Sequence, residues 1–278
     1  MKKLLLTTLF FLALFTPIGF LNAATKVTPI KILIVPGHDN EVWGAQYGYV
    51  KEADMNLNLS NRIYNILKKD KRFEVHITRK IGGYTKEFED YLTNNREAII
   101  AFKENAKKEM QVAIDSGDFV EKENPPHNDA SEEVAIKLYG FNKWANENKM
   151  DVVIHVHFND YPRETPWVSG IHKGFAIYTP EEQMVNAKGS SDLSKKILKE
   201  LKKKYITSTY EEEKGGLVPD QSLIALGSNG TLLPSVRSLL IEYGYIYRFK
   251  TKAARMSAYA NMASLTSAGI KSYFFPKK

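Results

Sequence analysis

An apolar run that ends in a histidine constrains this chain more than any other feature. Residues 32–39 read Ile-Leu-Ile-Val-Pro-Gly-His-Asp. Four consecutive aliphatic residues bounded by Pro-Gly predict a short strand that is buried on both faces. Such strands occur in parallel sheets covered by helices, and α/β proteins bind ligands at the carboxyl ends of these strands. His38 therefore stands where a functional site would form.

The rest of the chain alternates strands of this kind with amphipathic helices. Further strands are predicted at 73–78, 151–159, 173–178 and 238–242, and helices at 53–69, 84–110, 131–148, 190–204 and 251–266. This alternation predicts one α/β domain over residues 27–278, with a mixed, mostly parallel sheet and helices on both faces. No internal repeat and no Pro/Ser-rich linker marks a second domain.

The first residues have the layout of a secretory signal peptide. Met1-Lys2-Lys3 precede an apolar stretch, and Leu21-Asn22-Ala23-Ala24 follow it. We expect residues 1–23 to be the signal peptide, with cleavage after Ala23 or Ala24. The alternative is an uncleaved membrane anchor, but the apolar stretch is barely long enough to span a bilayer. The expected product is an exported protein, periplasmic or extracellular, without stable membrane association.

The composition limits which residues can bind a metal and which polymers the protein is expected to bind. The chain has no cysteine, so any bound metal must be held by histidines and carboxylates. Its 39 Lys and Arg against 32 Asp and Glu give a formal charge of +7, which falls to +5 when Lys2 and Lys3 are removed. A mild positive charge suits an anionic polymer such as a cell wall. Basic residues are not concentrated beyond 202–204, so nucleic-acid binding is not expected.

Four side chains stand at equivalent places in the predicted sheet. Three apolar strands end near His38, His157 and Glu242, and a helix begins beside Glu52. If the strands are neighbours, these side chains converge at one edge. Two histidines and a carboxylate, with a fourth position open to water, make a catalytic zinc site. A second carboxylate that does not bind the metal can deprotonate the water and protonate the leaving group.

The ordered motifs of the chain resemble those of the zinc-dependent N-acetylmuramoyl-L-alanine amidases, the type 3 amidases. The matching segments are VPGHD at 35–39, KEADMNL at 51–57, EVHITR at 74–79, HFN at 157–159, PSV at 234–236, IEYGYI at 241–246 and AGIKSY at 268–273. One such motif alone would be weak evidence, whereas the ordered series is specific. The resemblance covers most of residues 30–275, apart from 80–130.

This resemblance implies that His38, Glu52 and His157 bind zinc and that Glu242 is the general base and acid. The implied reaction is hydrolysis of the amide between the lactyl group of N-acetylmuramic acid and the L-alanine of the stem peptide, so the expected partner is peptidoglycan. Two alternatives stay open. One is a zinc peptidase that acts on stem-peptide bonds, and the other is a non-catalytic peptidoglycan-binding or regulatory module.

Two polar residues of the 151–159 strand have less certain roles. His155 stands where the family usually has a small hydroxyl residue, and the period of a strand puts it on the same face as His157. We expect it to hydrogen-bond a carboxylate behind the ligands. The alternatives are an extra ligand or a transition-state donor. Asn159 either orients substrate or has a structural role.

The segment 80–130 makes the stretch between Glu52 and His157 longer than the family usually shows. It is expected to be an inserted helical segment. One interpretation is a solvent-exposed helical decoration. The other is a lid or wall over the zinc cleft, autoinhibitory if His127 or an acidic side chain approaches the metal. An activator protein is a candidate partner if the segment is a lid.

Overall fold

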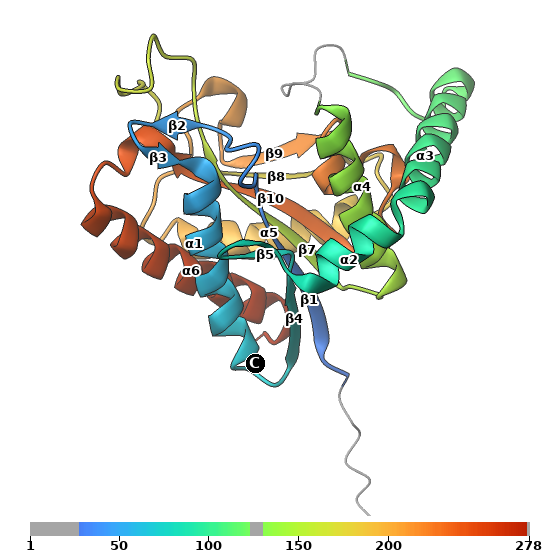
Figure 1. Cartoon of the computed structure of the whole chain (residues 1–278), viewed down its shortest axis with the longest axis horizontal. Coiled ribbons are helices and arrows are strands. Elements are labelled where there is room, and N and C mark those ends of the chain that lie inside the picture. Colours follow the sequence, from blue (N-terminus) through green and yellow to red (C-terminus); the bar gives the residue numbers. More distant parts are fainter. Residues whose placement is uncertain (1–27, 123–129, 277–278) are drawn as a thin grey trace, which may run out of the picture.

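A six-stranded sheet forms the centre of the computed structural model, which describes residues 28–122 and 130–276 (Figure 1). The strands are β1 (Ile30–Pro36), β4 (Phe73–Ile77), β7 (Val152–Asn159), β8 (Ala176–Pro180), β9 (Leu217–Asp220) and β10 (Arg237–Tyr245). Their order is β4-β1-β7-β10-β8-β9. Only the β10–β8 pair is antiparallel. The expected mixed, mostly parallel sheet is confirmed.

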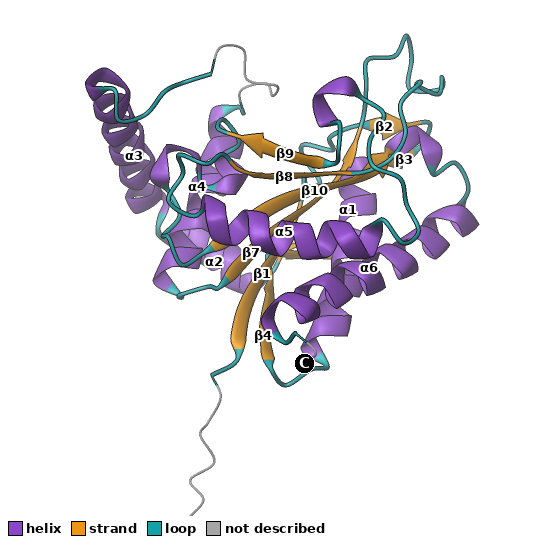
Figure 2. Cartoon of the chain, turned by 180° about the vertical axis from the view of Figure 1, so that it is seen from behind, coloured by secondary structure: helices purple, strands orange, loops and turns teal. Residues whose placement is uncertain are grey.

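Helices cover both faces of this sheet (Figures 1 and 2). One layer holds α1 (Glu52–Lys68), α5 (Ala187–Leu201) and α6 (Lys252–Phe274), and the other holds α2 (Lys86–Asn94), α3 (Arg96–Ser116) and α4 (Glu132–Glu147). The side chains of Ile32 and Ile34 pack in the first core, and those of Leu33 and Val35 pack in the second. The consecutive aliphatic residues of β1 are thus explained by burial on both faces.

The three strands that end in candidate site residues are neighbours. β1 pairs with β7 on one side, and β10 pairs with β7 on the other. The register sets Glu242 directly beside His157, and it sets His155 between Val35 and Leu240. Since these strands run parallel, their carboxyl ends meet at one edge of the sheet, as the sequence predicted.

Several elements differ from the expected ones. The helix expected at 84–110 is divided into α2 and α3 at Asn95, and α3 continues to Ser116, where Gly117 adopts a φ of 80°. The last helix reaches Phe274. The short edge strand β9 and two hairpins were not predicted; the hairpins are β2 (Gln46–Tyr47) with β3 (Val50–Lys51), and β5 (Arg79–Lys80) with β6 (Gly83–Tyr84).

The inserted segment belongs to the second helical layer. The rings of Phe88 in α2 and Trp144 in α4 lie 4.7 Å apart, and Phe88 and Ile99 are fully buried. The segment therefore contributes to the core and is more than a surface decoration. Its residues 123–129, which include His127, lie outside the described residues, as does the expected signal peptide. None of the helices in the described ranges is long and apolar enough to cross a membrane.

Close packing of α5 on α6 makes Gly269 a test of this fold. A Cβ at Gly269 would lie 2.6 Å from the Cα of Ile197 and 2.9 Å from its nitrogen. Helix propensity alone would make Gly269→Ala stabilising by about 1 kcal/mol. Because a backbone clash cannot be relieved by a side-chain rotation, we expect the free energy of unfolding in urea to fall by about 1–2 kcal/mol instead.

The exposed Ser264 on the same helix supplies the control for this substitution. Ser264→Ala should change the free energy of unfolding by less than about 0.5 kcal/mol. A Gly269→Ala variant as stable as the parent would show that α5 and α6 are not held at this distance.

Candidate metal centre

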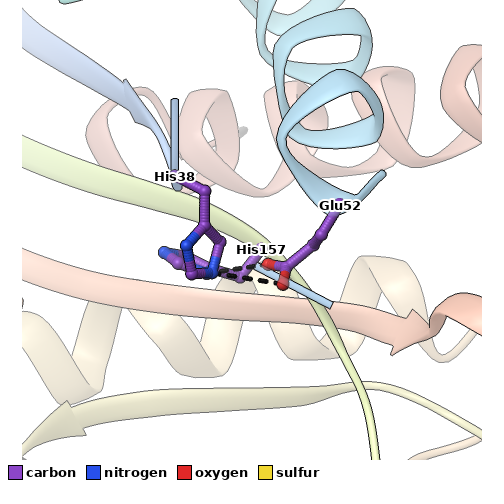
Figure 3. A group of neighbouring side chains, drawn as sticks. All are labelled: His38, Glu52 and His157. Atoms are coloured by element: carbon purple, nitrogen blue, oxygen red, sulfur yellow. Dashed lines mark hydrogen bonds and ion pairs between the residues drawn. The ribbon is translucent and has the colours of Figure 1, made fainter. Parts of the chain in front are cut away.

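His38, Glu52 and His157 converge at the carboxyl edge of the sheet (Figure 3). His38 lies in the loop after β1, Glu52 is the first residue of α1, and His157 lies near the end of β7. One candidate ligand atom from each lies within 4.8 Å of the others. The Glu52 Oε2 atom is 3.2 Å from His38 Nε2, and Glu52 Oε1 is 3.0 Å from His157 Nδ1. The carboxylate therefore bridges the two imidazoles.

The local backbone brings these side chains together. His38 adopts a φ of 59°, a left-handed conformation that residues with a Cβ adopt uncommonly. Gly37 lies against the ring of His157, where a Cβ would overlap it. Gly44, with a φ of 71°, lies against the side chains of Glu52 and His38 in the same way. The two glycines thus let the chain pass directly beside the ligands.

Glu52 is fixed from three directions. The backbone amides of Ala45 and Phe158 donate hydrogen bonds to its two oxygens at 2.9 and 3.2 Å. The side-chain amide of Asn56, one helical turn on, donates to Glu52 Oε1 and to the carbonyl of Gly37, both at 3.0 Å. Glu52 also stands at the first turn of α1, where the helix dipole favours a negative charge. The carboxylate is thereby preorganised before any ion binds.

The electrostatics of the site favour a cation. Burial raises the pKa of Glu52, but the hydrogen bonds from His157 and His38 outweigh burial and hold that pKa far below its usual value. Burial lowers the pKa of His38, yet its hydrogen bond with Glu52 leaves that pKa raised overall. Ligands of a tetrahedral zinc ion at about 2.0–2.2 Å lie about 3.3–3.6 Å apart. The separations of 3.0 and 3.2 Å join the two different oxygens of Glu52 to the imidazoles, and one candidate ligand atom of each residue lies within 4.8 Å of the others, so the donor set suits such an ion in chemistry and proximity.

Glu242 lies beside this group without belonging to it. The sheet register pairs it with His157. Its Oε2 atom is buried and has no hydrogen-bond partner among the described residues. Burial, followed by the charges of Glu52 and Glu213, raises the pKa of Glu242 well above its usual value. A second carboxylate that readily holds a proton therefore stands next to the three candidate ligands.

His155 lies deeper in the sheet than His157 and is outside the converging group of three. It is 1% exposed, and its Nε2 atom has no hydrogen-bond partner within the described part of the chain. Burial lowers the pKa of His155 to about 3, and the neighbouring His157 contributes to the shift. The imidazole is thus uncharged, and the hydrogen bond to a carboxylate that the sequence suggested is not made by Nε2.

Asn159 is held in a buried hydrogen-bond network centred on Glu213. Its Nδ2 atom donates to Glu213, which also accepts from the hydroxyls of Tyr178 and Tyr245 at 2.7 and 2.9 Å. The Asn159 Oδ1 atom accepts from the amide of Asp160. These contacts favour the structural role for Asn159. Glu213 was missed because an acidic run at 211–213 looks like a solvated surface in the sequence.

Asp39, which follows His38, anchors the ligand loop to other elements. Its Oδ2 atom accepts from Lys137 in α4 at 2.7 Å and from the hydroxyl of Tyr84 at 3.1 Å. Burial raises the pKa of Asp39, but the hydrogen bonds from Lys137 and from the amides of Val42 and Glu41 lower it to about 2. The sequence placed Asp39 in a motif but offered no signal for these distant partners.

A cavity of about 980 Å³ opens beside the candidate ligands, on the α4 side of the sheet. His38, His155 and His157 line it together with Lys107 and Met110 of α3. The inserted segment therefore walls the same cavity as two of the candidate ligands. This placement agrees with the expected wall, whereas an autoinhibitory approach of His127 stays a prediction.

The sequence profile of one protein family matches this chain. The family is described as N-acetylmuramoyl-L-alanine amidase, and the match runs over residues 32–272. It contains His38, Glu52, His157 and Glu242. No curated protein was found to match the chain.

Solved structures of several amidases share the fold. An N-acetylmuramoyl-L-alanine amidase from Clostridium difficile 630 is 16% identical, with a TM-score of 0.54 over 90% of this chain and 99% of that one. The CwlD amidase from Clostridioides difficile, in complex with the GerS lipoprotein, is 16% identical, with a TM-score of 0.57 over 88% of this chain and 98% of that one. The catalytic domain of CwlV from Bacillus (Paenibacillus) polymyxa var. colistinus is 15% identical, with a TM-score of 0.55 over 89% of this chain and 99% of that one. At these identities the likeness shows the fold alone.

Asn56 offers a test of how the candidate ligands are positioned. Asn56→Leu keeps the branched shape of the side chain, although it is larger, and removes the donor that holds both Glu52 and Gly37. Loss of such a supporting hydrogen bond typically weakens metal affinity about 10–100-fold. We expect a loss in this range when zinc affinity is measured by competition with a chromogenic chelator.

The matched control is Asn58→Leu, an exposed position on the same helix whose side-chain amide donates to the carbonyl of Asp54. Its zinc affinity should equal that of the parent. Equal affinities for Asn56→Leu and the parent would mean that Asn56 does not position Glu52.

Proposed function

The chain belongs to the N-acetylmuramoyl-L-alanine amidase family of peptidoglycan hydrolases, and we propose that it cleaves its substrate with a zinc ion held by His38, Glu52 and His157. The bond cleaved is the amide between N-acetylmuramic acid and the L-alanine of the stem peptide. The observation that carries the zinc assignment is the convergence of two imidazoles and one buried carboxylate at the sheet edge.

Glu52 and His157 lie on α1 and β7, and His38 follows β1 directly, which favours one fixed arrangement of donor atoms. When bound, the zinc ion supplies Lewis acidity for the scissile carbonyl and lowers the pKa of the attacking water. Asn56 and the amides of Ala45 and Phe158 keep the carboxylate of Glu52 aimed at the imidazoles. The neutral, buried His155 adds no charge behind them.

Glu242 is the proposed general base and acid. In its ionised form the carboxylate takes a proton from the attacking water, and it then delivers that proton to the departing amine of L-alanine. Two observations support this role. Glu242 lies next to His157 in the register, and burial together with Glu52 and Glu213 raises its pKa, so the proton is held long enough to be passed on.

We further propose that the enzyme is exported and works in the cell wall, periplasmic or extracellular. The support for export is the signal-peptide layout of residues 1–23, together with the location of peptidoglycan outside the cytoplasmic membrane. An activating protein partner stays a prediction. Its support is that a structurally similar amidase, CwlD, was solved in complex with a lipoprotein, and that the inserted segment walls the cavity beside the candidate ligands.

Replacing the proposed base separates catalysis from metal binding. Glu242→Gln keeps the shape of the side chain and removes its ability to accept a proton. Loss of general acid–base catalysis costs about 10²–10⁴-fold, so release of dye-labelled fragments from peptidoglycan should fall by about 10³-fold. Zinc content, measured by mass spectrometry, should remain about one ion per chain.

The control is Glu212→Gln, an exposed residue of the 211–213 run, which should keep full activity. Substantial turnover by Glu242→Gln would remove Glu242 from the mechanism.

The products identify the bond that is cut. Digestion of purified peptidoglycan should release stem peptides that begin with L-alanine and leave glycan strands without peptides, as judged by mass spectrometry of both fractions. A chelator should abolish this release and zinc should restore it, because the ligands hold the ion reversibly. Fragments cut within the stem peptide would indicate a peptidase. Binding to the wall without any product would indicate a non-catalytic module.

A further inference from the structure

Two aromatic side chains are exposed to solvent on segments that adjoin the candidate ligands in the chain. Tyr49 is 89% exposed and Trp167 is 61% exposed. Their rings meet edge to face, with centroids 5.1 Å apart and an interplanar angle of 85°. We call these two residues the aromatic platform. Large apolar groups gathered at one exposed place on a protein commonly mark a binding surface. We therefore expect a ligand to bind at the aromatic platform.

The backbone beneath the aromatic platform is held firmly. The amide of Gly48 donates to the carbonyl of Pro166 at 3.0 Å, and the Trp167 ring lies so close over Gly48 that a Cβ there would be 3.0 Å from it. Arg163 donates to the carbonyl of Gln46 at 2.8 Å. These contacts join the loop after β7 to the β2–β3 hairpin. The rings are thus exposed on a preorganised surface, which reduces the entropic cost of binding a ligand.

The aromatic platform is continuous with the elements that carry two of the ligands. Tyr49 precedes Glu52 by three residues, which span at most roughly 10 Å of extended chain. Trp167 lies in the loop that leaves β7 after His157 and Asn159. The hairpin and this loop stand together at one corner of the molecule in both views (Figures 1 and 2).

The large cavity lies on another side of the same centre. Residues of α3 and α4 line it, and neither Tyr49 nor Trp167 does. Its wall carries charged side chains of both signs as well as apolar surface; the charged ones are Lys107, Lys122, Lys137, Asp39, Glu121 and Glu132. Two different surfaces thus lie around the candidate metal centre: a cavity whose wall carries both charges, and a pair of exposed rings on the segments that lead to and from the ligands.

The chemistry of the substrate matches this difference. The amide cleaved by the proposed function joins a sugar to a peptide, so the substrate leaves the reacting bond in two directions. A stem peptide is polar and charged, which suits a wall that carries both charges. A pyranose ring carries hydroxyls at its rim and C–H groups on its faces, and these faces stack on aromatic rings while the hydroxyls stay in water.

We propose that Tyr49 and Trp167 form a glycan subsite that holds a sugar ring of the strand adjacent to the N-acetylmuramic acid whose amide is cleaved. This inference rests on the proposed function, because only a substrate with a glycan part gives the exposed rings this occupant. The two side chains bind substrate at a distance from the reacting atoms. Their removal should therefore affect recognition of the polymer much more than the chemical step.

Binding to stem-free glycan strands tests the subsite directly. The full chain carrying Glu242→Gln is mixed with glycan strands whose peptides have been removed by an unrelated amidase, and bound protein is measured by co-sedimentation. Adding Trp167→Ala should weaken binding about tenfold, the effect of losing one well-placed stacking contact. Trp167→Phe should retain most of the binding because it keeps an aromatic face. Ile81→Ala, which changes a 93% exposed side chain elsewhere, should bind like the parent.

Kinetics on the active enzyme give a second readout. Trp167→Ala and Tyr49→Ala should raise KM for polymeric peptidoglycan about tenfold with kcat unchanged, since the lost contact holds substrate and transition state equally. The same variants should cleave a muramoyl-peptide without neighbouring sugars as the parent does. A drop in kcat on this small substrate would place the two residues at the reacting bond and would overturn the subsite.

The remaining outcomes separate this inference from the function on which it rests. Equal glycan binding by the parent and Trp167→Ala would overturn the subsite, even if stem peptides are released as expected. Trp167-dependent binding to phosphatidylglycerol vesicles in place of glycan, or a dimer that Trp167→Ala dissociates in sedimentation, would also overturn it. Trp167-dependent glycan binding without any release of stem peptides would support the subsite and contradict the proposed function.

Discussion

The bridge that the Glu52 carboxylate makes between His38 and His157 is the interaction on which the functional end of the molecule depends. A buried charge is costly unless it is paired and hydrogen-bonded. Here the pairing comes from two imidazoles, and the hydrogen bonds come from two backbone amides and Asn56. Because these partners belong to the loop after β1, to α1 and to β7, the charge at Glu52 holds three segments at fixed positions. The sheet and its helices are arranged so that this meeting is possible.

Two carboxylates stand at the same edge in contrasting surroundings. Glu52 has donors on both oxygens, and these hold its pKa far below the usual value. Glu242 lies on β10 beside His157 and has no partner for its Oε2 among the described residues; burial, followed by the charges of Glu52 and Glu213, raises its pKa. Surroundings that push the pKa values of neighbouring groups apart are a common basis for dividing roles in a site. The geometry thus favours Glu52 as a permanent anion and Glu242 as a carrier of protons.

Much of the fold followed from the pattern of apolar residues. The aliphatic run of β1 predicted a strand buried on both faces, and the structure sets Ile32 and Leu33 in opposite cores. The adjacency of β1, β7 and β10 was an expectation from parallel sheets in general, and it is what brings His38, His157 and Glu242 to one edge. Boundaries were less predictable. The break between α2 and α3 and the full length of α6 depend on packing, which overrides the local signals of a single sequence.

The sequence by itself determined the class of fold, the edge where the site forms and the four residues that meet there. It could do so because apolar periodicity and strand ends are local properties of the chain. Only the tertiary structure decided what surrounds those residues. It joined Asp39 to Lys137, enclosed Glu213 among tyrosines, set Asn56 behind the carboxylate and made the inserted segment a wall of the cavity. Most of these contacts link residues far apart in the chain, and none leaves a periodic trace in the sequence, so they arise only when the layers pack.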